Sequence, residues 1–153
     1  MPKSCQKSYF KSPIGILEIT YQNNALISLK SVNKIDSSSD DSDFIKNVKT
    51  QLDEYFIGKR QKFDIKTNPN GTDFQKKVWK ELQKIPYGKT KSYLEIATNI
   101  GHNNAQRAVG SACNKNPILI IIPCHRVINK SGKIGGFALG KSIKQKLLEL
   151  ESG

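Results

Sequence analysis

The sequence predicts an α+β fold: a small N-terminal α/β domain with a short antiparallel sheet, followed by a mostly helical domain that contains a helix-turn-helix. Apolar residues alternate with polar ones early in the chain and recur at helical spacing in its second half. Between these patterns lies Asn68-Pro69-Asn70-Gly71, a cluster of turn-forming residues. We therefore place a domain boundary there, giving domains 1–70 and 71–153.

The first domain is predicted to begin with a β-hairpin. Leu17, Ile19 and Tyr21 alternate with polar residues, which is the period of a half-buried strand. Asn23-Asn24 offers a turn because asparagine tolerates left-handed backbone angles. The chain can then return as a second strand over residues 25–29.

A helix and one more short strand are expected to complete the first domain. Gly58 stands where the helix would stop. Phe63 and Ile65 suggest the strand. The apolar residues at helical spacing are Phe44, Ile45, Val48, Leu52, Tyr55 and Phe56.

The second domain is predicted to be helical. Its first helix ends before Pro86 and carries one apolar face. Ser92 and Glu95 have the spacing of a capping box, which predicts the start of a second, short helix that Gly101 stops. The residues of the first apolar face are Phe74, Val78, Leu82 and Ile85.

A third helix is predicted over residues 105–114, capped by Asn103 or Asn104. Together with the preceding helix it has the pattern of a helix-turn-helix. Small residues would let this helix approach a neighbouring helix or a nucleic-acid groove closely. An ordinary helical hairpin is the alternative interpretation. The small residues are Ala105, Ala108, Gly110, Ser111 and Ala112.

The charge of the chain favours a polyanionic partner. The 153 residues carry a formal net charge of +12. Residues 1–70 hold 11 basic and 8 acidic side chains, a net of +3, and residues 71–153 hold 14 and 5, a net of +9. Nucleic acid is therefore the first expected partner and an anionic membrane surface the second, although a lysine-rich surface can also serve solubility alone.

No segment is apolar enough to cross a bilayer, since the longest strongly apolar run is 118–122. The N-terminus lacks the apolar core of a signal peptide, so we expect a cytoplasmic protein with no membrane association. The three cysteines, Cys5, Cys113 and Cys124, do not form the pattern of a disulfide framework or a zinc site. We therefore expect no metal and no cofactor.

Cys124 and His125 follow Pro123 at the end of the apolar run. A thiolate is the nucleophilic form of cysteine, and its ordinary pKa is about 8.5, so a nearby base would raise the reactive fraction. Neighbouring residues in a strand point to opposite faces, so His125 can serve Cys124 only if the chain turns there or a water bridges them. Taken alone, the dipeptide favours a buried, inert cysteine.

The wider context changes that interpretation. The motifs and their order closely resemble the O6-alkylguanine-DNA alkyltransferase family over residues 72–153, and more loosely over 1–70. The matching segments are Arg107-Ala108-Val109-Gly110, Asn116-Pro117, Ile122-Pro123-Cys124-His125-Arg126-Val127, Gly132, Gly135 and Leu147-Leu148-Glu149-Leu150-Glu151.

The resemblance implies a catalytic role for four residues. Cys124 would accept the alkyl group, and His125 would act as its base through a bridging water. Glu151 would orient the imidazole, and Asn116 would be a hinge packed beside the nucleophile. Such an arrangement is that of an activated nucleophile whose base is held by a third group.

The resemblance also implies how substrate and DNA are bound. Tyr93 would hydrogen-bond the flipped base, the Val127 backbone would contact the guanine edge, and Ala138 would shape the pocket. A stacked base cannot be reached in line, so the nucleotide must be extruded from the duplex. Arg107 would fill the space that the extruded nucleotide leaves. The remaining residues expected at the DNA are Ser92, Ala105, Ala108 and Gly110.

The implied activity is a single-turnover repair reaction. The alkyl group of O6-alkylguanine, and of O4-alkylthymine, in double-stranded DNA would move to Cys124. We expect binding through the minor groove without sequence preference, led by phosphate contacts, and a monomeric protein.

Three alternatives remain at this point. A helix-turn-helix module without catalysis would explain the charge but would assign no role to Cys124. A cysteine hydrolase would require turnover. A purely structural Cys124 would react with thiol reagents as slowly as Cys113, which we expect to pack in the core.

Overall fold

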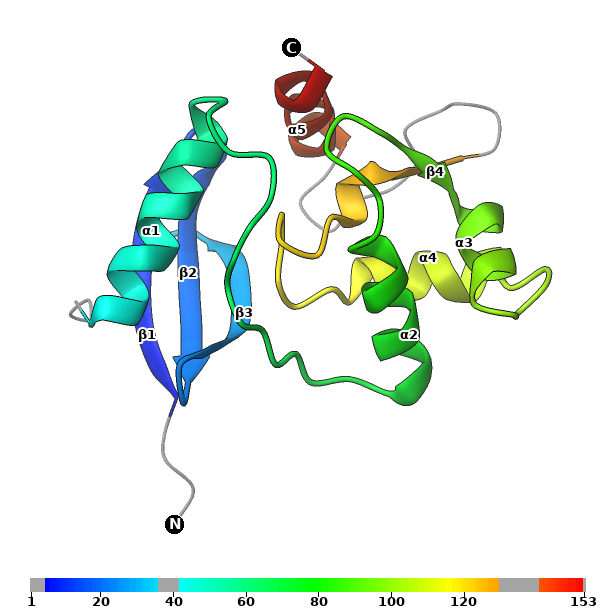
Figure 1. The fold of residues 1–153 in the computed structure, drawn as a ribbon, viewed down its shortest axis with the longest axis horizontal. Coiled ribbons are helices and arrows are strands. Elements are labelled where there is room, and N and C mark those ends of the chain that lie inside the picture. The colour runs from blue at the N-terminus through cyan, green and yellow to red at the C-terminus, as the bar shows by residue number, and fades with distance from the viewer. Residues whose placement is uncertain (1–4, 36–41, 130–140, 153) are drawn as a thin grey trace. The chain divides into compact units, whose positions relative to one another are not determined.

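The computed structural model describes residues 5–35, 42–129 and 141–152, and the chain forms two compact units, Met1–Asn70 and Gly71–Gly153. The first unit combines a three-stranded sheet with one helix (Figure 1). The second is mainly helical and includes a two-stranded ladder. The α+β fold class expected from the sequence is therefore confirmed.

The sheet of the first unit is antiparallel in the order β1-β2-β3. The predicted hairpin is confirmed, and Asn23 and Asn24 form its turn with φ of 53° and 56°. The edge strand β1 is an addition that the sequence pattern does not predict, because its two buried residues, Ser8 and Tyr9, are adjacent and give no alternation. The strands are β1 (Gln6–Ser12), β2 (Gly15–Gln22) and β3 (Ala25–Val32).

The predicted helix of the first unit is α1 (Asp43–Phe56), which begins after the N-cap Ser42. The Ser42 hydroxyl accepts a hydrogen bond from the Ile45 amide at 3.3 Å. Ring contacts fix α1 on the sheet, since Phe56 stacks on Phe10 with centroids 6.3 Å apart. Gly58 follows the helix with a φ of 80°, a left-handed angle that glycine adopts without strain.

The strand predicted at Phe63 and Ile65 is wrong. The Gln51 side chain of α1 takes the backbone groups that a strand would have used. Its Nε2 donates to the Asp64 carbonyl at 3.1 Å, and its Oε1 accepts from the Asp64 amide at 2.8 Å. Thr67 instead forms an isolated parallel bridge with Leu26.

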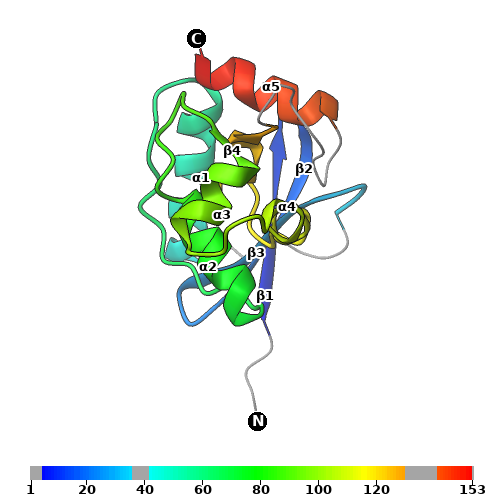
Figure 2. The same ribbon diagram turned by 90° about the vertical axis from the view of Figure 1, so that its right-hand side faces the viewer.

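Three helices form the body of the second unit, where α2, α3 and α4 pack against one another (Figure 2). Trp79 joins two of them, because its Nε1 donates to the Ala112 carbonyl at 2.9 Å and its ring is buried. A further helix, α5, packs against a single 3-10 turn, η1. The elements are α2 (Asp73–Leu82), β4 (Lys91–Ser92), α3 (Tyr93–Asn99), α4 (Gln106–Asn114), η1 (Cys124–Arg126), β5 (Val127–Ile128) and α5 (Lys141–Ser152).

One predicted helix cap is present and another is wrong. Ser92 and Glu95 form the complete capping box of α3. Helix α4, in contrast, follows Ala105 and has no side-chain cap. Asn104 adopts a φ of 63° and forms the turn between α3 and α4, so it does not occupy the cap position.

No helix among the described residues is long and apolar enough to cross a membrane.

Gly71 packs against the ring of Trp79, and we expect Gly71→Ala to destabilise the second unit. A Cβ at Gly71 would overlap the buried Trp79 ring, so the ring or the backbone would have to shift. Such overpacking costs about 1–3 kcal/mol. Urea unfolding followed by the fluorescence of Trp79, the only tryptophan, measures it.

The matched control is Gly110→Ala, whose Cβ would meet the Tyr93 ring at an ordinary 3.8 Å. Gly110 lies inside α4, where alanine is favoured over glycine by about 0.5–1 kcal/mol. Equal unfolding midpoints for the two variants would contradict the packing argument.

Candidate functional site

The apolar run before Cys124 is buried except for the half-buried Ile121, and it folds as turns and not as a strand. Ile118 and Ile122 are fully buried. Ile120 between them has a φ of 70°, in a region that β-branched residues rarely adopt. The Ile121 amide donates to the Leu119 carbonyl at 2.7 Å, which closes a γ-turn of the strained form.

A further tight turn places Cys124 itself. The Cys124 amide donates to the Ile122 carbonyl at 2.8 Å, around Pro123 with φ −83° and ψ 65°. These angles are those of an inverse γ-turn. The chain then continues as η1, so His125 does not follow Cys124 in extended backbone. Of the two conditions set for a working Cys124–His125 pair, a turn or a bridging water, the turn is present.

Asn116 holds this turn in place. Its side-chain Nδ2 donates to the Ile122 carbonyl at 2.7 Å and to Cys124 Sγ at 3.1 Å. Its Oδ1 accepts from the Ile118 amide at 2.9 Å. One buried amide therefore satisfies two backbone groups of the turn and contacts the sulfur.

His125 is fully buried and bonded to Glu151. Its Nε2 lies 2.7 Å from Glu151 Oε2, and the Glu151 side chain is only 1% exposed. Burial is the main influence on the His125 pKa and lowers it, while Glu151 acts in the opposite direction. A neutral imidazole that donates from Nε2 leaves Nδ1 as the basic nitrogen. Nδ1 makes no hydrogen bond to the described residues.

Arg126 is a buried residue of this site to which the sequence alone assigned no role. Its Nε donates to Glu151 Oε1 at 2.7 Å, and its Nη2 donates to Oε2 at 3.0 Å. Its Nη1 donates to the Ile85 carbonyl at 2.8 Å. The guanidinium also lies 5.8 Å from the centroid of the Tyr87 ring. The position of Arg126 inside the motif was a signal, but its partner 25 residues away was not apparent from the sequence.

Lys144 of α5 is another buried cation that the sequence alone did not identify. Its Nζ donates to the Val127 carbonyl and lies 3.5 Å from the Tyr93 hydroxyl. The pKa of Lys144 is lowered, because desolvation by burial outweighs the neighbouring Cys124 and Cys113, which raise it. The ammonium therefore joins the two groups that are expected to bind the substrate base.

The Cys124 thiol is protonated at neutral pH. Burial raises its pKa to about 11, against the hydrogen bond from Asn116 and the Lys144 ammonium, which lower it. Burial also raises the pKa of Cys113 to about 12. A reaction at Cys124 therefore requires a base to remove the proton, and His125 is the adjacent neutral one.

The residues expected at the DNA lie on or beside α3 and α4. Arg107 and Ala108 are exposed in the first turn of α4, while Ala105 and Gly110 are half-buried. Ser92 is buried, and its hydroxyl accepts from the Glu95 amide at 3.0 Å as the α3 cap.

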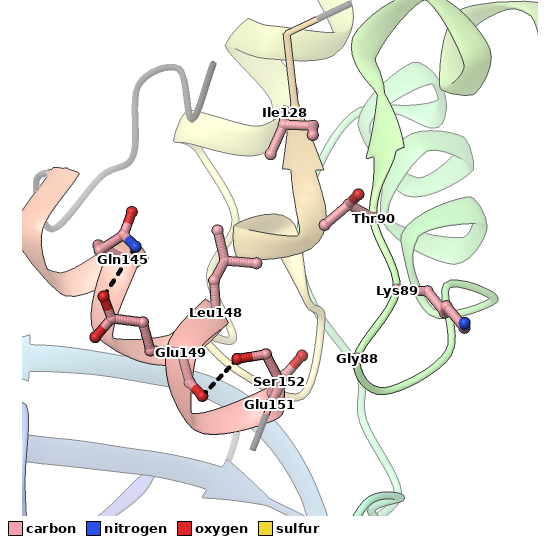
Figure 3. Close-up of a pocket in the computed structure, with 9 residues that line it drawn as sticks. All are labelled: Gly88, Lys89, Thr90, Ile128, Gln145, Leu148, Glu149, Glu151 and Ser152. Carbon is pink, nitrogen blue, oxygen red and sulfur yellow. Dashed lines mark hydrogen bonds between the residues drawn. The ribbon is translucent and has the colours of Figure 1, made fainter. Parts of the chain in front are cut away.

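Ala138 lies outside the described residues. A shallow cavity of about 310 Å³ opens beside Glu151, between α5 and the loop at Gly88 (Figure 3). No described residues form a group of three or more acidic, histidine or cysteine side chains that could hold a metal ion. Cys5 is exposed and Cys113 is buried in α4, and both are free thiols.

Two family models match the chain. Residues 73–153 match the 6-O-methylguanine DNA methyltransferase DNA-binding domain, and residues 6–69 match the ribonuclease-like domain of the same methyltransferase. The methylated-DNA–protein-cysteine methyltransferase of Methanosarcina acetivorans is 46% identical over 148 residues, which cover 93% of this chain and 95% of that protein. The Methanosarcina mazei protein of the same name is 51% identical over 129 residues, 82% of each chain.

Solved structures agree with these matches. The crystal structure of the Mycobacterium tuberculosis O6-methylguanine methyltransferase superposes with a TM-score of 0.88 at 42% identity, covering 97% of this chain and 93% of that one. The Mycobacterium tuberculosis OGT in complex with DNA gives a TM-score of 0.89 at 43% identity, covering 96% and 92%.

We expect Asn116→Ala to slow the reaction of Cys124 with iodoacetamide. The hydrogen bond from Asn116 lowers the Cys124 pKa, so its loss raises that pKa and reduces the thiolate fraction at any pH below it. The variant should also lose about 1–3 kcal/mol of stability, because buried backbone groups lose their partner. Peptide mass spectrometry measures the rate, with Cys113 as internal reference.

Asn99→Ala is the matched control, because Asn99 is exposed and bonds only Glu81 at 3.3 Å among the contacts described. Unchanged or faster modification of Cys124 in a folded Asn116→Ala protein would show that the amide does not support the thiolate.

Proposed function

The chain belongs to the 6-O-methylguanine DNA methyltransferase family and is a DNA repair methyltransferase, and we propose that Cys124 is the residue that receives the alkyl group. One observation carries this proposal: the Cys124 thiol is bonded to Asn116 and adjoins a neutral His125 that Glu151 holds. A nucleophile, a base and a group that orients the base thus occur together in one buried site.

The proposed reaction is a direct displacement. His125 Nδ1 takes the thiol proton through a bridging water, and the Cys124 thiolate attacks the alkyl carbon. The bond between that carbon and guanine O6 breaks, its electron pair stays on the base, and the base takes up a proton to become guanine. The thioether is stable, so each molecule acts once.

Tyr93, Val127 and Ala138 are proposed to bind the flipped base. The support for the first two is their link through Lys144, which contacts the Tyr93 hydroxyl and the Val127 carbonyl. The hydroxyl would donate to the base, and the carbonyl would accept from its amino edge. Ala138 is proposed from the resemblance alone.

The chain binds DNA, since residues 73–153 match the DNA-binding domain of the family. We propose that α4 enters the minor groove without sequence preference, because small residues line its first turns and Arg107 is exposed there. Arg107 would occupy the stack in place of the flipped nucleotide, which offsets part of the few kcal/mol that flipping costs. Ser92, Ala105, Ala108 and Gly110 would line the contact.

Three finer features are also proposed. O4-alkylthymine is another substrate, because it presents the same kind of alkyl carbon on a base oxygen. The protein acts as a monomer, since one acceptor thiol completes the reaction. It works in a reducing compartment such as the cytoplasm, because the transfer needs a free thiol and all three cysteines are free.

Mixing the protein with excess duplex that contains one O6-methylguanine should add one methylene to each molecule. The gain should lie in the peptide that contains Cys124 and stop at one equivalent, because nothing regenerates the thiol. Intact-protein and peptide mass spectrometry measure both. A parallel duplex with O4-methylthymine tests the other substrate.

In the same assay Cys124→Ser should gain nothing, while Cys113→Ser, the control for a buried thiol, should still gain one methylene. Tight binding without transfer would favour a module that only binds DNA. Many product equivalents per protein from a small ester would favour a hydrolase.

Arg107→Ala should slow transfer from duplex DNA by about tenfold, which corresponds to the loss of roughly 1.4 kcal/mol of the energy that offsets flipping. Transfer from the free base O6-benzylguanine should change little, because no stack has to be opened. Single-turnover rates on the two substrates measure the difference. Lys46→Ala on α1 is the control, and an equal loss on both substrates would refute the proposed role.

A further inference from the structure

Arg126 has no role in the proposed reaction, yet it makes two hydrogen bonds to Glu151. It binds both carboxylate oxygens from Nε and Nη2, in the bidentate geometry that makes arginine–carboxylate pairs strong. Its third nitrogen, Nη1, is fixed by the Ile85 carbonyl at 2.8 Å. The guanidinium is therefore held in place independently of His125.

The geometry leads us to propose that Arg126 is a positioning residue, which keeps Glu151 ionised and so fixes His125 as the Nε2–H tautomer with Nδ1 left as the base. This role rests on the proposed function, in which that nitrogen takes the Cys124 proton. An ionised carboxylate only accepts hydrogen bonds. A carboxylate at 2.7 Å from Nε2 therefore requires a proton on Nε2.

Arg126 also acts on the charge of the imidazole. Without a cation beside it, the buried Glu151 carboxylate would stabilise a protonated His125, and an imidazolium cannot accept a proton. Burial contributes most to lowering the His125 pKa, and Arg126 opposes the effect of the carboxylate by lowering that pKa further, as does Lys144. His125 therefore stays neutral and available as the base.

Among the described residues, the charged and titratable groups around His125 come from α5, η1 and the loop that follows α2. Glu151 and Lys144 belong to α5, and Cys124 and Arg126 to η1. In the loop that follows α2, the Tyr87 hydroxyl donates to the Leu150 carbonyl at 3.2 Å, and the pKa of Tyr87 is raised by burial and by Glu151. Among the contacts described, Arg126 is a cation that bonds the same carboxylate oxygen that His125 uses.

The test compares Arg126→Met, which removes the charge, with Arg126→Lys, which keeps it. In Arg126→Met the pKa of His125 should rise, so a larger fraction of the base is protonated at a given pH. The single-turnover rate should fall by about 10- to 100-fold at pH 7, the loss typical when a partner that orients a metal-bound histidine is removed, and recover at higher pH. Arg126→Lys should retain more of the rate.

The pH profile separates positioning from a structural defect. A merely structural loss would lower the rate by the same factor at every pH. Arg60→Met, which breaks the Arg60–Glu54 pair of the first unit, is the matched control and should leave the profile unchanged. If Arg126→Met unfolds, Arg126→Met combined with Glu151→Gln removes both charges of the pair. The pH profile of the single-turnover rate of that double variant should then match the profile of Glu151→Gln alone.

Another readout needs no DNA and so does not depend on the proposed function. The chain has two histidines, and His102→Gln leaves His125 as the single imidazole. Nitrogen-15 NMR across a pH titration should show the neutral Nε2–H tautomer with Arg126 present, and the imidazolium should appear at higher pH in Arg126→Met than with Arg126 present. An unchanged neutral tautomer in the variant would overturn the inference even if methyl transfer were confirmed.

Discussion

The C-terminal unit depends on one buried carboxylate. Glu151 accepts hydrogen bonds from His125 and twice from Arg126, with almost none of its side chain exposed. A buried charge without partners costs several kcal/mol, so the fold must bring η1 and α5 together with these groups aligned. The loop after α2 completes the enclosure: Ile85 accepts from Arg126, and a Cβ at Gly88 would lie 3.1 Å from the Glu151 carbonyl.

This constraint also shapes the chemistry. The same burial that makes Glu151 dependent on its partners raises the Cys124 pKa and lowers that of His125, so the resting site holds a neutral thiol beside a neutral base. A protein that is consumed by a single transfer benefits from a nucleophile that stays protonated until substrate arrives. In the proposed reaction, reactivity comes from placing the alkyl carbon against the Cys124 sulfur, and not from a permanently exposed thiolate.

The sequence predicted the elements that depend on neighbouring residues along the chain. The β2–β3 hairpin, for example, follows from the alternation of apolar and polar residues and from the Asn23-Asn24 turn. Pairings between distant residues carry no local signature. The short strand expected after α1 failed because Gln51 binds the backbone of that segment. In the candidate site, the resemblance predicted Cys124 as the nucleophile and His125 as its base, and both roles stay predictions. It gave no role to Arg126, whose partner Glu151 is 25 positions away, and Lys144 has the sequence context of any surface lysine in a basic chain.

Hydrogen bonds of Asn116 link Cys124, the proposed nucleophile, to α4, the predicted DNA-binding helix. Helix α4 begins next to the exposed Arg107 and ends at Asn114. The Asn116 amide then donates to the Cys113 carbonyl of α4 at 3.2 Å, while its side chain bonds Cys124 Sγ. Any displacement of α4 along its axis would therefore be transmitted through Asn116 to the sulfur. In the proposed function Arg107 enters the base stack near one end of α4, and Asn116 contacts the Cys124 sulfur just beyond the other end. The depth to which α4 inserts would then influence the position of the proposed nucleophile.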